Sequence, residues 1–147
     1  SMKISDLLAL ELGESVSVAN EPFTKMGQAE ITLDDGTKMF WLFDDEDHLM
    51  SVAPKEDELV IFQEITEEIE PSETILFQNK EYEFSYEDSG KVKQVEGDTL
   101  VEEEDRYAFS DYQSKDGETI RLITNENSGE VLGYSGHTVS EDDLLEI

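Results

Sequence analysis

The sequence predicts a mainly β protein built of antiparallel sheets, with a short N-terminal helix and a helical turn near the C-terminus. In several stretches, among them 29–33 and 81–87, apolar and polar residues alternate with the two-residue period of half-buried strands. Asp-Gly and Asn-Ser-Gly sequences separate such stretches, and these residues tolerate the positive φ angles of tight turns. We expect either two similar β-hairpin units or a sandwich- or barrel-like arrangement of the strands.

The first half of the chain carries one helix signal and four strand signals. Ser5 is predicted to cap a short helix that runs through Leu12, and Gly13 to end it. The predicted strands are 15–18, 29–33, 38–43 and 58–65. Asp34-Asp35-Gly36 is predicted to join the second and third of these as a hairpin.

The second half is predicted to be a meander that ends in a capped turn. Strands are expected at 74–78, 81–87 and 91–95, with turns at 79–80 and 88–90. Further strands are expected at 105–112, 119–123 and 130–134. Ser140 caps the last helical turn, since the Asp143 carboxylate can reach back to it.

The length of 147 residues predicts a single β-rich domain. Asp35-Gly36 with the apolar run after it parallels Asp116-Gly117 with the run after it, so two pseudo-repeated halves of about 14–65 and 74–139 form an open alternative. Ser1 in front of Met2 looks like a cloning remnant.

The net charge of −28 restricts the classes of function. Such a chain repels phosphate backbones and anionic lipid heads, so we expect neither nucleic-acid binding nor direct membrane insertion. No apolar run approaches the roughly 20 residues of a membrane-spanning helix. The chain has no cysteine, which excludes disulfides and thiolate metal sites. A cytoplasmic protein is the default expectation.

Five consecutive apolar residues, 39–43, predict a strand that is apolar on both faces. One face packs in the core. The other face needs a cover, for which the N-terminal helix is the expected element and the second half or another chain are the alternatives.

A metal site is one hypothesis for the densest acidic run, whose candidate ligands are Asp44, Asp45, Asp47 and His48. Consecutive acids point in different directions, however, and the run contains no glycine for the sharp bend of a calcium loop. A solvated turn that shields the preceding apolar strand is the favoured interpretation.

No catalytic residue and no cofactor is predicted. The stretch 133–137 resembles a nucleophile elbow, but His137 stands where the final glycine belongs, and a tight turn with a surface histidine is expected instead. A cation-assisted or carboxylate enzyme remains an alternative hypothesis.

The acidic excess is concentrated in segments that are candidates for a partner surface. The candidate residues are Glu67, Glu68, Glu70, Glu102, Glu103, Glu104 and Asp105. A non-catalytic accessory domain that binds a basic protein partner is therefore the favoured hypothesis. A nucleic-acid mimic, which needs acids spaced like phosphates, is a further alternative.

Three short motifs carry a resemblance to a known family. They are Trp41-Leu42 followed by two aspartates; Phe77-x-x-x-x-Tyr82-x-Phe84 leading to Val92 and the run 95–98; and Glu130-x-x-x-Tyr134-x-Gly136-x-x-Val139. In these the chain resembles the bacterial domain-of-unknown-function family numbered 4178, over roughly two-thirds of its length. The resemblance implies a β-rich domain without established catalytic residues, with a cytoplasmic accessory role in a membrane-stress or polyamine-related gene context.

Overall fold

The computed structural model describes residues 2–147, so the interpretation of Ser1 as a cloning remnant lies outside the described residues. These residues form one short α-helix, twelve β-strands and two 3-10 turns. In chain order they are α1 (Ile4–Ala9), β1 (Ser15–Val18), β2 (Glu21–Thr24), β3 (Gly27–Leu33), β4 (Lys38–Phe43), β5 (His48–Ala53), η1 (Pro54–Glu56), β6 (Glu58–Ile65), β7 (Thr74–Phe77), β8 (Lys80–Gly97), β9 (Arg106–Gln113), β10 (Glu118–Asn125), β11 (Val131–Val139), η2 (Glu141–Asp143) and β12 (Leu144–Glu146).

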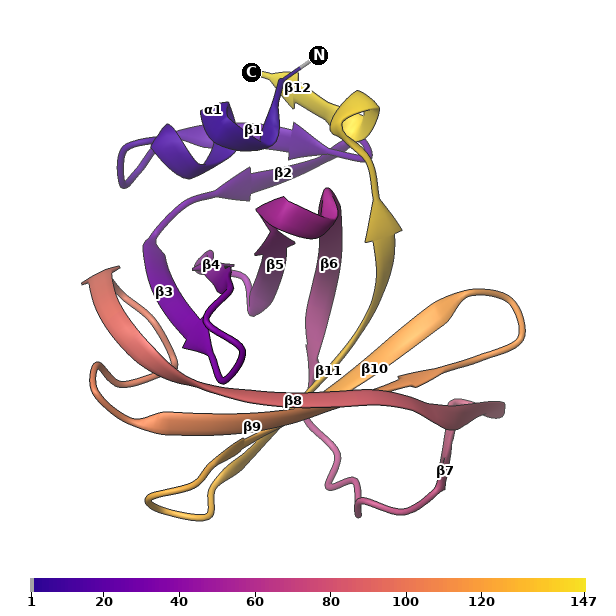
Figure 1. Ribbon diagram of the computed structural model, residues 1–147. Helices are drawn as coiled ribbons and strands as arrows, with labels where there is room; N and C mark the ends of the chain where they lie inside the picture. The colour runs from indigo at the N-terminus through magenta and orange to yellow at the C-terminus, as the bar shows by residue number, and fades with distance from the viewer. Residues whose placement is uncertain (1) are drawn as a thin grey trace.

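Eight strands close into an antiparallel barrel in the order β3-β4-β5-β6-β11-β10-β9-β8, with β8 pairing back to β3 (Figure 1). The barrel thus joins two four-stranded meanders, β3–β6 and β8–β11, at the β6–β11 and β3–β8 pairs. One edge of β8 pairs with β9, and the other pairs first with β7 and then with β3. The predicted mainly β, antiparallel, barrel-like fold is confirmed.

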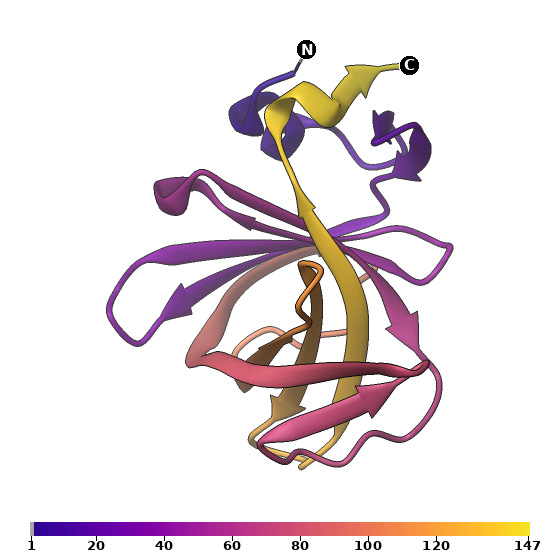
Figure 2. The same cartoon turned by 90° about the vertical axis from the view of Figure 1, so that its right-hand side faces the viewer.

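A second, three-stranded sheet in the order β12-β1-β2 lies with α1 against the outside of the barrel (Figures 1 and 2). It brings both ends of the described chain together, because the Met2 N–H donates to the carbonyl of Leu144. We call α1, β1, β2 and β12 the terminal cover.

The apolar run in β4 divides between the two sides of the barrel wall. Met39, Trp41 and Phe43 point into the barrel core. Leu42 and Phe40 point outward and pack in a cluster that includes Leu7 of α1. The prediction that the N-terminal helix covers the second face of this strand is confirmed.

The barrel interior contains one buried cation, Arg121, whose residue is only 1% exposed. Its Nε and Nη2 donate to the two carboxylate oxygens of Asp111 at 2.7 and 2.9 Å, and its Nη1 donates to Ser51 Oγ at 2.7 Å. The guanidinium stacks over the Phe62 and Phe109 rings, with its central carbon 5.1 and 4.7 Å from the ring centroids. A fork of donors matched to a carboxylate is the geometry that makes a buried charge tolerable.

The predicted turn at 88–90 is wrong, because β8, which is 18 residues long in total, runs through these residues without a break. Gly90 serves a close approach of strands rather than a turn. A Cβ there would lie 2.5 Å from the carbonyl oxygen of Thr32 in β3. The glycine is therefore required where the barrel closes.

The N-terminal helix is shorter than predicted, and Ser5 lies inside it rather than at its cap. The Lys3 N–H donates to Asp6 Oδ2, which fixes the first turn. The helix ends before Gly13 because the buried ammonium of Lys25 binds the carbonyls of Leu8 and Leu10 at 3.0 and 2.7 Å. Burial lowers the pKa of Lys25, an effect that nearby glutamates partly offset.

Three strands were not predicted: β2, β5 and β12. The helical turn capped by Ser140 is confirmed as η2, where the Ser140 N–H donates to Asp143 Oδ2 at 2.9 Å.

Candidate functional site

The outer face of the β6–β11 pair is covered twice, with a gap between the covers. Leu59, Ile61 and Val139 lie under the terminal cover. Ile65 lies under a second cover, formed by residues 66–73 and β7, through Ile69 and neighbouring side chains. We call residues 66–73 the connector. We call each cross-strand residue pair of β6 and β11 a rung. Between the two covers the rungs carry polar side chains, and Ser135 pairs there with Gln63.

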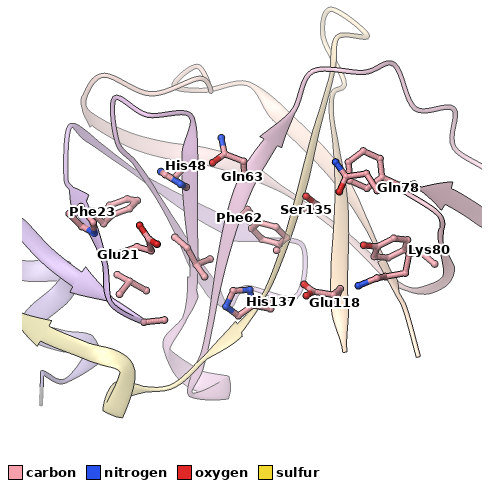
Figure 3. A pocket seen from close by; sticks show the side chains of 17 residues that line it. Glu21, Phe23, His48, Phe62, Gln63, Gln78, Lys80, Glu118, Ser135 and His137 are labelled. Carbon is pink, nitrogen blue, oxygen red and sulfur yellow. The ribbon is translucent and has the colours of Figure 1, made fainter. Parts of the chain in front are cut away.

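This gap is a cleft of about 570 Å³, which we call the outer cleft (Figure 3). Apolar side chains of the terminal cover, β6 and the β7–β8 hairpin form much of its surface: Val18, Pro22, Phe23, Ile61, Phe77 and Tyr82. Its polar groups come from six strands and the β7–β8 turn, and include Glu21, His48, Gln63, Gln78, Lys80, Glu118, Ser135 and His137. A cleft of this volume with an apolar lining and a few convergent polar groups is typical of a binding site.

The uncompensated charge of the outer cleft is negative. Glu21 lies on the side of the terminal cover, and Glu118 on the opposite side beside Lys80 (Figure 3). The Lys80 ammonium is already paired with Asp116 at 2.8 Å. This hydrogen bond raises the pKa of Lys80 and lowers the pKa of Asp116, so both remain charged near neutral pH.

The floor of the cleft corrects another sequence-based expectation. Residues 133–137 are not a tight turn but the middle of β11. Gly136 is needed there because a Cβ would lie 1.9 Å from the carbonyl oxygen of Ile61 on β6. His137 projects from this extended segment to the edge of the cleft.

Of the four predicted metal ligands, the structure brings together Asp44 and His48. Asp44 Oδ1 accepts hydrogen bonds from the N–H groups of Glu46 and His48 at 2.9 and 2.8 Å, and its Oδ2 lies 2.7 Å from His48 Nδ1. Because an ionised carboxylate only accepts, Nδ1 is the donor. Asp44 therefore holds the tight loop and orients the imidazole at the edge of the outer cleft.

Asp45 and Asp47 are exposed parts of the same loop. The Asp47 backbone has a φ of +63°, and its carbonyl accepts the N–H of Glu64 at 2.9 Å. Within residues 2–147, no three His, Asp or Glu side chains gather in a way that could hold a metal ion.

The connector places Glu67 and Glu68 beside a second depression of about 440 Å³, which we call the connector groove. Its apolar lining includes Ile65, Ile69 and the half-exposed Val131. Glu64 lies in the same groove, where burial and the charge of Asp47 raise its pKa. Glu70 is exposed further along the connector.

The other predicted partner cluster, residues 102–105, is tied to its surroundings. Glu103 Oε1 accepts the N–H of Val95 at 3.0 Å, and Glu104 pairs with Lys91 at 2.8 Å. Asp105 Oδ2 accepts a hydrogen bond from the Asn125 side chain at 3.0 Å. In contrast, no ion pair within residues 2–147 involves Glu67, Glu68 or Glu70.

Sequence reasoning did not find the outer cleft. The sequence carries one sign of the outer cleft: polar residues interrupt the outward-facing apolar positions of two strands. These residues are Gln63 on β6 and Ser135 and His137 on β11. Those polar positions share one patch only because β6 and β11, which are far apart in the sequence, pair with each other.

The fold and the cleft together define a class of protein: an eight-stranded antiparallel barrel domain with a cleft on its outer face. The chain belongs to the family described as Domain of unknown function (DUF4178), whose model matches residues 13–141. This match confirms the resemblance seen in the sequence motifs. Comparisons with curated proteins and with solved structures gave no match.

Among residues 2–147, no helix combines the length and the apolar character needed to cross a bilayer.

Proposed function

We propose that this chain is a non-catalytic accessory domain of the cytoplasm that binds a basic protein partner through its acidic surface. The observation that supports this proposal most directly is the connector. There, Glu67 and Glu68, which form no ion pair within residues 2–147, lie in one groove with the exposed Val131 and the partly buried Ile69.

Acidic side chains without an ion pair repel one another and attract basic groups. A run of like charges destabilises a surface by self-repulsion, and a partner with Lys and Arg relieves it. Complementary charge mainly raises the association rate, while apolar contacts in the groove slow dissociation. The connector offers both kinds of group within a few residues.

Within the proposed partner surface, we assign a larger part to the connector than to residues 102–105. Three of the four acids at 102–105 bind groups of their own chain, so we expect them to contribute less to docking than the connector acids. Neither the cation-assisted alternative nor the nucleic-acid mimic gains a specific supporting observation.

The test is affinity capture from a lysate of the native cells, followed by identification of the retained protein and measurement of its binding to purified chain. The connector variant carries Glu67→Gln, Glu68→Gln and Glu70→Gln. The matched control removes the same charge from exposed positions of β8, with Glu81→Gln, Glu83→Gln and Glu87→Gln.

We expect a Lys- and Arg-rich protein that binds wild-type chain and the β8 control at about 50 mM salt and is released at about 500 mM. The connector variant should bind it at least about tenfold more weakly. A retained protein that binds the connector variant as tightly as wild type, or the absence of any basic partner, contradicts the proposal.

A further inference from the structure

The connector groove and the outer cleft lie end to end on one pair of strands. The rung formed by Ile65 and Gly133 lines the connector groove, and the rung formed by Gln63 and Ser135 lines the outer cleft. These rungs are two residues apart on the same face of both strands, a separation of about 6.8 Å.

We infer that a partner segment bridges the connector groove and the outer cleft, with basic residues at the connector and one apolar side chain inserted in the outer cleft. This inference rests on the proposed function and names the partner's chemistry: a basic segment with a large aliphatic or aromatic anchor. The outer cleft is then the specific part of the site and the connector its electrostatic part.

The chemistry of the cleft selects the anchor and its flanks. The side chains of Phe23, Ile61 and Phe77 provide an apolar surface, and a volume of about 570 Å³ admits the largest apolar side chains. Glu21 and Glu118 lie on opposite sides of this surface, so Lys or Arg residues on either side of the anchor would meet a carboxylate. Interface energy is usually concentrated in such a central anchor, with charged contacts around it.

The negative charge of the chain argues against other occupants of the connector groove and the outer cleft. A second copy of a chain with a net charge of −28 would be repelled at these carboxylates. A nucleic acid or an anionic lipid surface would be repelled for the same reason. Charge complementarity therefore favours a cationic segment.

The test uses two short synthetic peptides titrated into isotopically labelled chain, with the backbone amide shifts of the protein as the readout. One peptide carries a lysine cluster and, further along, a single phenylalanine between lysines. The control peptide has serine in place of phenylalanine, and both are also made in reversed order because the orientation of the segment is open. Two variants are compared, Ser135→Phe, which fills the outer cleft, and Ser85→Phe, its control at an exposed position of β8.

The expected result is that the phenylalanine peptide shifts amides in the connector and also those of Gln63, Ser135 and His137. The serine peptide should shift only the connector and bind at least about tenfold more weakly. Ser135→Phe should reduce binding of the phenylalanine peptide to the level of the serine peptide, while Ser85→Phe leaves it unchanged. Thermal unfolding establishes that both variants are folded.

Two results would overturn the inference, and they differ in what they say of the proposed function. Equal binding of both peptides, with shifts confined to the connector, removes the outer cleft from the site but leaves electrostatic docking at the connector. No shifts in either region at about 1 mM peptide would contradict both.

Discussion

Two acidic segments of similar sequence behave differently in this fold: the loop at 102–105 and the connector at 66–73. In the loop, three of four carboxylates bind a backbone N–H, a lysine or an asparagine of the same chain. In the connector, Glu67, Glu68 and Glu70 form no ion pair within residues 2–147, although the partly buried Ile69 among them packs against the barrel wall. Acid density along a sequence therefore does not measure how much charge is free to bind a partner.

The difference follows from what each segment has to do for the fold. The loop makes the reversal between β8 and β9, and its carboxylates accept hydrogen bonds that the reversal leaves open. The connector crosses the outer face of the barrel with a single apolar anchor, so its acids have no such task. The following variants test this contrast between charges that hold the fold and charges that do not.

The largest effect is expected for the charge held most firmly, Arg121. Arg121→Met leaves the Asp111 carboxylate without its fork of donors, and should lower the free energy of unfolding by about 3–5 kcal/mol. Urea denaturation at neutral pH measures this loss.

The double variant Arg121→Met with Asp111→Leu is the control for that prediction. Replacing both charges by apolar groups should recover most of the lost stability. If the double variant is as unstable as Arg121→Met, packing over Phe62 and Phe109, rather than the unpaired carboxylate, accounts for the loss.

An intermediate effect is expected in the loop. Asp105→Ala removes one of the two acceptors of the buried Asn125 amide nitrogen, the other being the Tyr107 hydroxyl, and should lower the free energy of unfolding by about 1–2 kcal/mol. Glu104→Gln, which breaks only an exposed ion pair, should change it by less than about 0.5 kcal/mol. Equal midpoints of urea denaturation for the two variants would show that the loop acids are not structural.

A smaller, pH-dependent effect is expected at Glu64, at the start of the connector groove. Its pKa is raised in the folded state, first by burial and then by Asp47, so the folded protein binds this proton more readily than the unfolded chain does. The resulting destabilisation is absent below the unfolded pKa and appears as pH rises through the folded pKa.

Glu64→Gln should therefore increase the free energy of unfolding at pH 7, by less than about 1 kcal/mol, and so raise the thermal midpoint. Near pH 3.5 the thermal midpoint should be nearly unchanged. Glu58→Gln, at the exposed start of the same strand, is the control. If the thermal midpoint rises equally at both pH values, the ionised carboxylate of Glu64 is not the cause of the destabilisation.

The smallest effect on stability is expected for the connector variant with Glu67→Gln, Glu68→Gln and Glu70→Gln. Its free energy of unfolding should stay within about 0.5 kcal/mol of wild type, with any change in the stabilising direction because repulsion is relieved. If urea denaturation shows a loss of more than about 1 kcal/mol in the free energy of unfolding, the connector acids stabilise the fold as the loop acids do.

The sequence was sufficient for elements whose cause is local. The strands 38–43 and 58–65 were predicted with the bounds that the structure has, because in each a continuous apolar run is bounded by polar residues. The need for glycine at position 90 could not be predicted. It arises from the close approach of the Thr32 carbonyl, which lies on a strand distant in the sequence. The end of α1 was misplaced for the same reason, because Lys25 rather than Gly13 binds its last carbonyls.

The site was less predictable than the fold. The acids of the connector stand out in the sequence, but the outer cleft depends on the pairing of β6 with β11 and on two covers that leave the same rungs open. The sequence makes His48 a candidate metal ligand. The structure instead holds it by Asp44 at the edge of a cleft, a role that requires the barrel to be formed.

The closure of the barrel by β8 also sets an order of events during synthesis. Residues 27–65 leave the ribosome before the segment 90–97 that pairs with the free edge of β3, so the open edges of β3 and β6 must wait for partners made later. Such long-range pairing is slow, and in the meantime the apolar face of β4 is exposed to other nascent chains. Charges that flank an apolar strand oppose its association with other strands. We therefore expect the acidic loop that directly follows β4 to act while the sheet is still incomplete.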